Sequence, residues 1–168
     1  MSEEATTDQH LQYMHHALSL ANKAAELGEV PVGAVVVVDG VIVGEGWNRP
    51  ITDNDPTAHA EVVALRDAAK NVDNYRLVNA DMYVTIEPCS MCAGAMVHAR
   101  IARLIYGATE PKAGVAQSRT EFFKSPWLNH RIEVIGGVLG DECSAKISAF
   151  FKQRRAVIKA DKKAKSPL

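Results

Sequence analysis

The sequence predicts an α/β fold in which a five-stranded mixed sheet is flanked by helices. Segments with helical and strand periodicity alternate along the chain, as in folds that layer helices on a sheet. Near residue 40 an Asp-Gly pair separates two apolar runs, which is typical of a β-hairpin. With 168 residues, 47% of them hydrophobic, the chain can bury about 70% of its unfolded surface around one core. We expect a single domain over residues 1–168, ordered over about 8–160, with a basic tail at 161–168.

The first half of the chain is predicted to form a helix, a hairpin and a second helix. Residues 9–27 have apolar side chains at helical spacing, and Gly28 is a typical helix end. Residues 32–38 and 41–47 are the two strands of the hairpin. A loop rich in turn formers follows, and an amphipathic helix is then expected over 60–70, with His59 at its N-terminus.

The second half is predicted to alternate strands with helices. We expect strands at 82–86, 103–106 and 132–135, a helix beginning at Pro88, and a closing helix from 141 to about 162. Residues 107–130 form a connection without clear periodicity, and a connection that long is usually functional or contains a further element. A short helix or packed flap is expected around 120–123, because Phe122, Phe123 and Trp127 would be costly to leave in water.

Two short segments, 59–61 and 88–92, supply three side chains suited to zinc: His59, Cys89 and Cys92. Structural zinc sites are closed by four protein ligands, whereas catalytic sites keep one position open. Pro88 suits the first turn of a helix, whose positive end stabilises thiolates. Taken alone, each residue has a simpler explanation, since CxxC cysteines are as often buried core thiols, and a lone histidine is more often a packing or surface residue.

Glu61 is the candidate general acid and base. An HxE motif followed about thirty residues later by PCxxC is the signature of zinc-dependent nucleobase deaminases. Zinc lowers the pKa of bound water to about 7, and a carboxylate off the metal can carry the proton to the ring and the leaving amine. Positions i and i+2 do not share a helix face, so this interpretation requires His59 to lie in an irregular first turn.

Charge, apolar content and cysteine count indicate where in the cell the protein is expected and whether it contains disulfides. The net charge is only −1. The N-terminus has no apolar signal region and no apolar run approaches the 18 or so residues that span a membrane, so the expected location is cytoplasmic and no membrane contact is expected. Three cysteines do not pair evenly, and two have metal spacing, which disfavours a disulfide framework. Cys143 is interpreted as a buried thiol.

The C-terminal segment suggests a nucleic-acid partner. Residues 152–168 contain seven basic side chains and one acidic side chain, Asp161, and follow the pair Phe150-Phe151. Basic groups neutralise phosphates and exposed aromatic rings stack on bases, which suits single-stranded or looped nucleic acid. A solvated helix face with core phenylalanines is the alternative.

From about residue 8 to 159 the chain resembles the bacterial tRNA adenosine deaminase family, the TadA type. The segments that carry the resemblance are VPVGAV (30–35), GEGWN (44–48), DPTAHAE (55–61), YVTIEPC (83–89) and MCAGAM (91–96). Glu110, Gln117 and Arg119 depart from the usual family pattern.

The resemblance implies a three-layer cytidine deaminase-like fold, one zinc ion per subunit, and a homodimer. It also implies hydrolytic deamination of adenosine to inosine at the wobble position, 34, of a tRNA anticodon, with an arginine tRNA as the expected partner. Base-pocket roles are implied for Asn48, Val30, Val32 and Ala60, and anticodon-loop contacts for Glu110, Lys112, Asn129, Phe151 and Arg155. A zinc deaminase of a free nucleobase or nucleotide such as guanine or cytosine is the alternative, and a noncatalytic RNA-binding module that retains zinc is a third reading.

Overall fold

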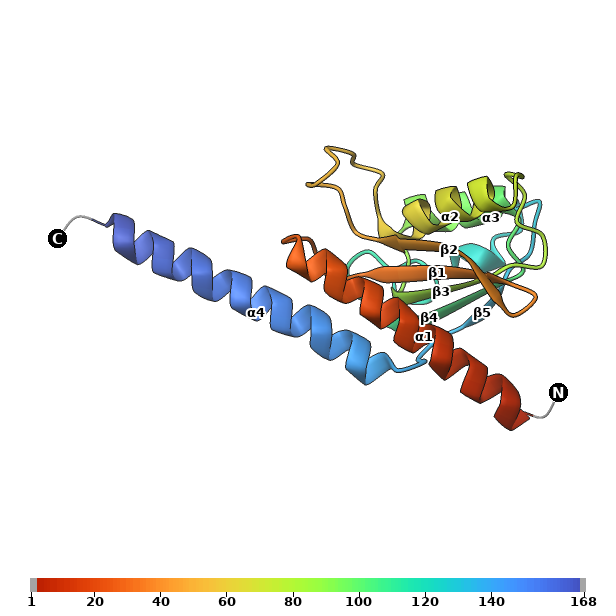
Figure 1. Cartoon of the computed structure of the whole chain (residues 1–168), viewed down its shortest axis with the longest axis horizontal. Helices are drawn as coiled ribbons and strands as arrows, with labels where there is room; N and C mark the ends of the chain where they lie inside the picture. Colours follow the sequence, from red (N-terminus) through yellow and green to blue (C-terminus); the bar gives the residue numbers. More distant parts are fainter. Residues whose placement is uncertain (1–2, 167–168) are drawn as a thin grey trace.

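The computed structural model describes residues 3–166, and these form four α-helices, a 3-10 turn and one sheet (Figure 1). The helices are α1 (Glu3–Glu26), α2 (Ala60–Asn71), α3 (Ser90–Ala99) and α4 (Gly140–Lys165), and the 3-10 turn is η1 (Phe122–Lys124). The strands are β1 (Gly33–Val38), β2 (Val41–Trp47), β3 (Asp81–Ile86), β4 (Arg103–Ala108) and β5 (Glu133–Ile135). The predicted fold class is confirmed. Residues 1, 2, 167 and 168, the ends of the predicted domain and tail, lie outside the described residues.

The strand directions determine where a site can form. The sheet order is β2-β1-β3-β4-β5. Strand β1 is antiparallel to β2 and to β3, whereas β3, β4 and β5 are parallel to one another. Four strands therefore run the same way, and their carboxyl ends meet at one edge of the sheet. In open α/β sheets, ligands bind outside the carboxyl ends of the strands.

Helices cover both faces of the sheet and make three layers (Figure 1). Side chains alternate between the two faces of a strand, so each strand contributes to two cores. Val35, Tyr83 and Ile105 pack with α1 and with Cys143 of α4, whereas Val36, Met82 and Leu104 pack with α2 and α3. Cys143 is buried, as its interpretation as a core thiol requires.

Some boundaries differ from the predicted ones. Helix α1 begins six residues earlier than expected. The prediction does not include residues 3–8 because they lack the apolar spacing that marks the rest of the helix. Helix α3 begins at Ser90 instead of Pro88, and α4 continues to Lys165. The expected element near 120–123 is a single 3-10 turn, in which Phe123 is buried, whereas Trp127 is 70% exposed, so the expectation that it packs away from water is wrong. None of the described helices is both long and apolar enough to cross a membrane.

Two glycines in β2 allow α2 to lie against the sheet. A Cβ atom added to Gly46 would lie 2.5 Å from the backbone nitrogen of Ala64 and would also overlap the carbonyl of Ala60. Gly44 meets Ala64 and Ala68 in the same way. This close approach fixes the start of α2, which carries His59 and Glu61.

We expect Gly46→Ala to lower the free energy of unfolding by about 1–3 kcal/mol, the usual cost of overpacking a well-packed contact. The atoms it would strike are backbone atoms, which side-chain rotation does not relieve. Gly94→Ala is the matched control, because a Cβ added to Gly94 in α3 meets nothing within 4 Å. Urea unfolding of both variants checks the prediction, and equal stability of the two would contradict it.

Candidate metal centre

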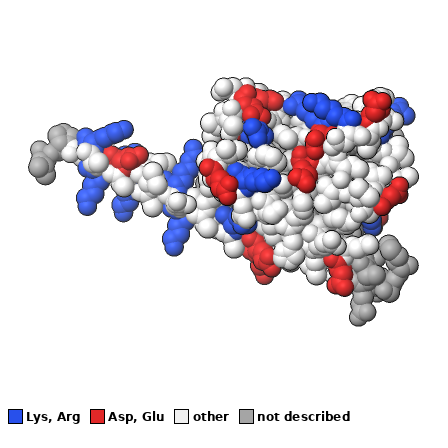
Figure 2. Space-filling model, viewed as in Figure 1, with Lys and Arg blue, Asp and Glu red and all other residues white. Residues whose placement is uncertain are grey.

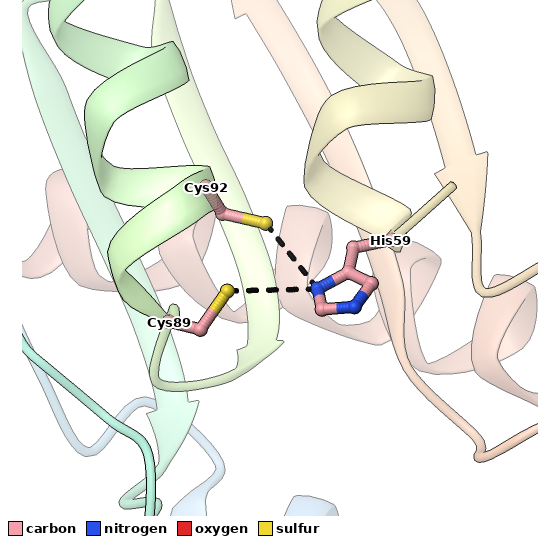
Figure 3. A group of neighbouring side chains, drawn as sticks. All are labelled: His59, Cys89 and Cys92. Atoms are coloured by element: carbon pink, nitrogen blue, oxygen red, sulfur yellow. Dashed lines mark hydrogen bonds between the residues drawn. The ribbon is translucent and has the colours of Figure 1, made fainter. Parts of the chain in front are cut away.

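His59, Cys89 and Cys92 come together at the carboxyl edge of the sheet (Figure 3). His59 is the N-cap residue of α2 and Cys89 is the N-cap residue of α3, while Cys92 lies in the first turn of α3. Their ligand atoms all lie within 4.8 Å of one another. Among the described residues, this is the only group of three or more His, Cys, Asp or Glu side chains arranged to hold a metal ion.

The distances within this cluster fit a tetrahedral zinc ion. Each of the two Sγ atoms lies 3.6 Å from Nδ1 of His59. Zn–S bonds of about 2.3 Å and Zn–N bonds of about 2.0–2.1 Å at a tetrahedral angle separate sulfur and nitrogen by about 3.6 Å. Two thiol groups and one imidazole are also ligands that zinc prefers, and three protein ligands leave one position for water. The residues present therefore fit zinc.

The cluster stabilises a thiolate. A hydrogen bond from Cys92 lowers the pKa of Cys89 to about 4, and a second hydrogen bond from His59 acts in the same direction. The hydrogen bond with Cys89 in turn raises the pKa of His59. Because thiolate is the form that binds metal, Cys89 is primed as a ligand at neutral pH.

Glu61 faces the three ligand residues from the first turn of α2. Only 3% of its surface is exposed. Its carboxyl group interacts with the charges of His59 and Cys89 and is hydrogen-bonded with Cys92, and burial raises its pKa to about 7. His59 has extended dihedral angles, φ −71° and ψ 151°, so it lies outside the helical repeat. The side chains of His59 and Glu61 can therefore face the same point although they are only two residues apart. This is the irregular first turn that the sequence interpretation requires.

Asn48 connects the end of β2 to the start of α2. Its side-chain oxygen accepts a hydrogen bond of 2.9 Å from the backbone N–H of Ala60, and its backbone N–H donates to the carbonyl of Val32. Bonding the oxygen to α2 directs the amide NH₂ group away from the helix. Ala60 and Val32 are buried, and Val30 is half-buried against the same core. These four predicted pocket residues thus lie near one another at the start of α2.

The residues predicted to contact RNA lie on three separate parts of the chain. Glu110 and Lys112 belong to the loop after β4, where the Glu110 carboxylate accepts a 2.8 Å hydrogen bond from the N–H of Lys112. Phe151 and Arg155 are one turn apart on α4, so they share a face.

Asn129 accepts a 2.7 Å hydrogen bond from Arg100, which ends α3. The metal ligands lie at the opposite end of that helix. At about 1.5 Å per residue, the ten-residue helix α3 is about 15 Å long, so its C-terminal end, from which the Arg100 side chain reaches Asn129, lies about that far from the ligands. The structure therefore does not bring Asn129 to the metal centre of its own chain.

Two buried glutamates at the site were not expected from the sequence. Glu29 accepts hydrogen bonds from the N–H groups of Ile51 and Thr52 and from the Thr52 hydroxyl, and so anchors the loop before His59. Glu87 likewise anchors the loop after β4, because it accepts hydrogen bonds from the N–H groups of Glu110 and Gln117. Each bonds backbone groups more than twenty residues away, and no local pattern in the sequence indicates such contacts.

Comparison with known proteins supports a deaminase. A model of the cytidine and deoxycytidylate deaminase zinc-binding region matches residues 7–108. The chain is 56% identical over 150 residues to a tRNA-specific adenosine deaminase of Haemophilus influenzae, covering 89% of this chain and 87% of that protein. A tRNA-specific adenosine deaminase of Bacillus subtilis is 42% identical over 151 residues, covering 90% and 94%.

Solved structures of related enzymes share the fold. One, from a study of A-to-I editing by tRNA:A34 deaminases at the wobble position of transfer RNA, is 44% identical with a TM-score of 0.78, covering 80% of this chain and 98% of that chain. A guanine deaminase of Bacillus subtilis is 34% identical with a TM-score of 0.58, covering 92% and 95%.

Proposed function

This chain belongs to the cytidine and deoxycytidylate deaminase family, and from that premise we propose that it hydrolyses adenosine to inosine at the wobble position, 34, of a tRNA anticodon. The observation that carries the proposal is 56% identity, over most of both chains, to a tRNA-specific adenosine deaminase. The cluster of His59, Cys89 and Cys92 beside a buried Glu61 supplies the chemistry that this reaction needs.

The side chains at the centre have separate roles in the proposed reaction, which consumes water and releases ammonia. His59, Cys89 and Cys92 would hold one zinc ion per chain, which supplies an activated water when bound. Glu61 accepts one proton of the attacking water and delivers it to the ring nitrogen, and it then passes the second proton, from the new hydroxyl group, to the leaving amine. Because Glu61 is buried, that proton is protected from exchange with bulk solvent.

The pocket residues select and orient the base. Asn48 presents its amide NH₂ group toward the adenine, because its oxygen is held by Ala60. Val30, Val32 and Ala60 supply apolar walls for the flipped ring. An enzyme that acts on a base must take it out of the stack, and an anticodon loop offers unpaired bases at low cost.

The basic end of α4 supports an RNA substrate. Its seven basic residues are exposed and lie on a helix that projects from the body of the molecule (Figure 2): Lys152, Arg154, Arg155, Lys159, Lys162, Lys163 and Lys165. Phe151 is 38% exposed on the same helix. We propose that Phe151 and Arg155, together with Glu110, Lys112 and Asn129, contact the anticodon loop, and that the lysines beyond them contact phosphates.

The phosphate contacts lead to a prediction about salt. Replacing Lys159, Lys162 and Lys163 by glutamine is expected to weaken RNA binding and to lower the slope of log affinity against log salt by about 2, at about 0.7 per single-strand phosphate contact. Titrating a labelled anticodon stem-loop at several salt concentrations measures this slope. The control variant replaces Lys70 and Lys124 on the body of the protein, and an equal change in slope for both variants would refute the contacts.

A deaminase of free nucleobases is the second candidate, favoured by the 34% identity to a guanine deaminase. Ammonia release measured in parallel with an anticodon stem-loop, guanine, cytosine and adenosine separates the two functions. We expect release with the stem-loop and little with the free compounds. Release with guanine or cytosine alone would favour the second candidate.

The assembly and location of the protein are also proposed. We infer a homodimer from the resemblance to tRNA adenosine deaminases, and light scattering of the purified protein would show twice the mass of the 18.2 kDa chain. An arginine tRNA is the proposed partner, and a tRNA substrate implies a cytoplasmic location.

A further inference from the structure

The carboxylate of Glu87 is a buried charge with no part in the proposed chemistry. Only 2% of its surface is exposed, and it lies directly after β3, two residues before Cys89. Its Oε1 atom accepts hydrogen bonds from the N–H of Glu110, at 3.0 Å, and from the Ser118 hydroxyl. Its Oε2 atom accepts from the N–H groups of Gln117, at 3.0 Å, and Ser118, at 2.9 Å. All four partners lie in the loop after β4.

This loop, residues 109–118, is wrapped around the carboxylate. Strands β3 and β4 are parallel and pair Ile86 with Ala108, so the loop and the segment before Cys89 leave the sheet side by side. The N–H of Val115 donates to the carbonyl of Pro88 at 3.0 Å. A Cβ atom added to Gly114 would lie 2.6 Å from Oε2 of Glu87, so this backbone passes as close as glycine permits.

The same contacts fix two residues proposed to meet RNA. The N–H of Glu110 is bonded to Glu87, and the Glu110 carboxylate accepts from the N–H of Lys112. We propose that Glu87 is a positioning residue for RNA: it holds residues 109–118 so that Glu110 and Lys112 meet the anticodon loop beside the metal centre. The inference rests on the proposed tRNA function and adds a residue that acts without touching the substrate.

The chemistry of the contacts requires a carboxylate at this position. Three N–H groups and one hydroxyl converge on Glu87, and all of them can donate. An ionised carboxylate offers only acceptors, whereas a glutamine would direct its own NH₂ donors at one pair of partners. Glu87→Gln keeps the size of the side chain and leaves buried donors without an acceptor, so it releases the loop and leaves the metal ligands unchanged.

The test is steady-state kinetics of Glu87→Gln with an anticodon stem-loop, together with zinc content and hydrogen exchange. We expect KM to rise about tenfold with kcat within about threefold of wild type, a tenfold loss being the scale of one well-placed contact. Zinc content stays at the wild-type value, and the amides of Gln117 and Ser118 exchange faster. The control is Glu121→Gln, the same change at an exposed carboxylate, which leaves all of these values unchanged.

Other outcomes decide against the inference. An unchanged KM with faster exchange would show that the loop does not position RNA, and loss of zinc or a fall in kcat alone would assign Glu87 to the metal centre. Ser118→Ala removes one of the four donors to Glu87. If Glu87→Gln does not fold, Ser118→Ala is the test: a rise in KM of less than tenfold supports the inference, and an unchanged KM rejects it. If the wild-type protein makes no inosine, the proposed function fails, whereas a change in exchange without a change in KM rejects only the role of Glu87.

Discussion

Replacing Glu61 by glutamine is expected to lower kcat by about 10³-fold or more while the protein retains its zinc, because proton transfer by a positioned side chain contributes about 10²–10⁴-fold. Glutamine has nearly the same shape, but it cannot accept the proton of the attacking water. The side chain is 3% exposed and is surrounded by the ligand residues, so bulk water does not replace it easily. Single-turnover rates with an anticodon stem-loop measure the fall in rate, and zinc analysis of the same sample measures the retained metal.

The matched control is Glu26→Gln, an exposed carboxylate on α1, which is expected to keep the wild-type rate. A zinc-loaded Glu61→Gln protein that turns over at the normal rate would remove Glu61 from the mechanism. Loss of zinc from this variant would instead make Glu61 part of the metal site.

Replacing Cys89 by serine is expected to lower the zinc content to less than about a tenth of wild type and to abolish activity, because a hydroxyl does not provide the thiolate that zinc prefers. Cys89 carries the thiolate of the cluster, since its pKa is lowered to about 4 by Cys92 and His59. The variant therefore loses a ligand that is already a thiolate at neutral pH. Metal analysis after gel filtration measures the loss.

Cys143→Ala serves as the control for this loss. Cys143 is as buried as Cys92, but it packs between α4 and the sheet, in the other core. We expect this variant to keep its zinc and its activity. If both variants lost zinc to the same extent, general instability would explain the result, and the assignment of Cys89 as a ligand would fail.

The elements of the fold that depend on local pattern could be predicted from the sequence. The Asp39-Gly40 turn between two apolar runs determines the hairpin of β1 and β2. The PCxxC spacing places both thiol groups at the start of a helix, and in the structure Cys89 is the N-cap residue of α3 and Cys92 lies in its first turn. For His59 and Glu61 the spacing alone was ambiguous, because only the extended backbone at the N-cap removes the conflict with helical periodicity.

Other parts of the site depend on contacts between distant residues and had no local signal. No local sequence pattern distinguishes Glu29 and Glu87 from the other glutamates. Only the hydrogen bonds from loops more than twenty residues away reveal their roles. Asn129 was grouped with the anticodon contacts by resemblance, and its bond to Arg100 puts it at the far end of α3. The close approach of α2 to β2 is likewise visible only once Gly44 and Gly46 are placed against the helix.

The most direct test of the proposed function is to incubate the zinc-loaded protein with the anticodon stem-loop of an arginine tRNA and to sequence the RNA for inosine. We predict one inosine, at position 34, and no change at other adenosines, because only the wobble base is expected to enter the pocket beside Asn48 and Glu61. A stem-loop that remains unmodified while the same protein releases ammonia from guanine or cytosine would contradict the account.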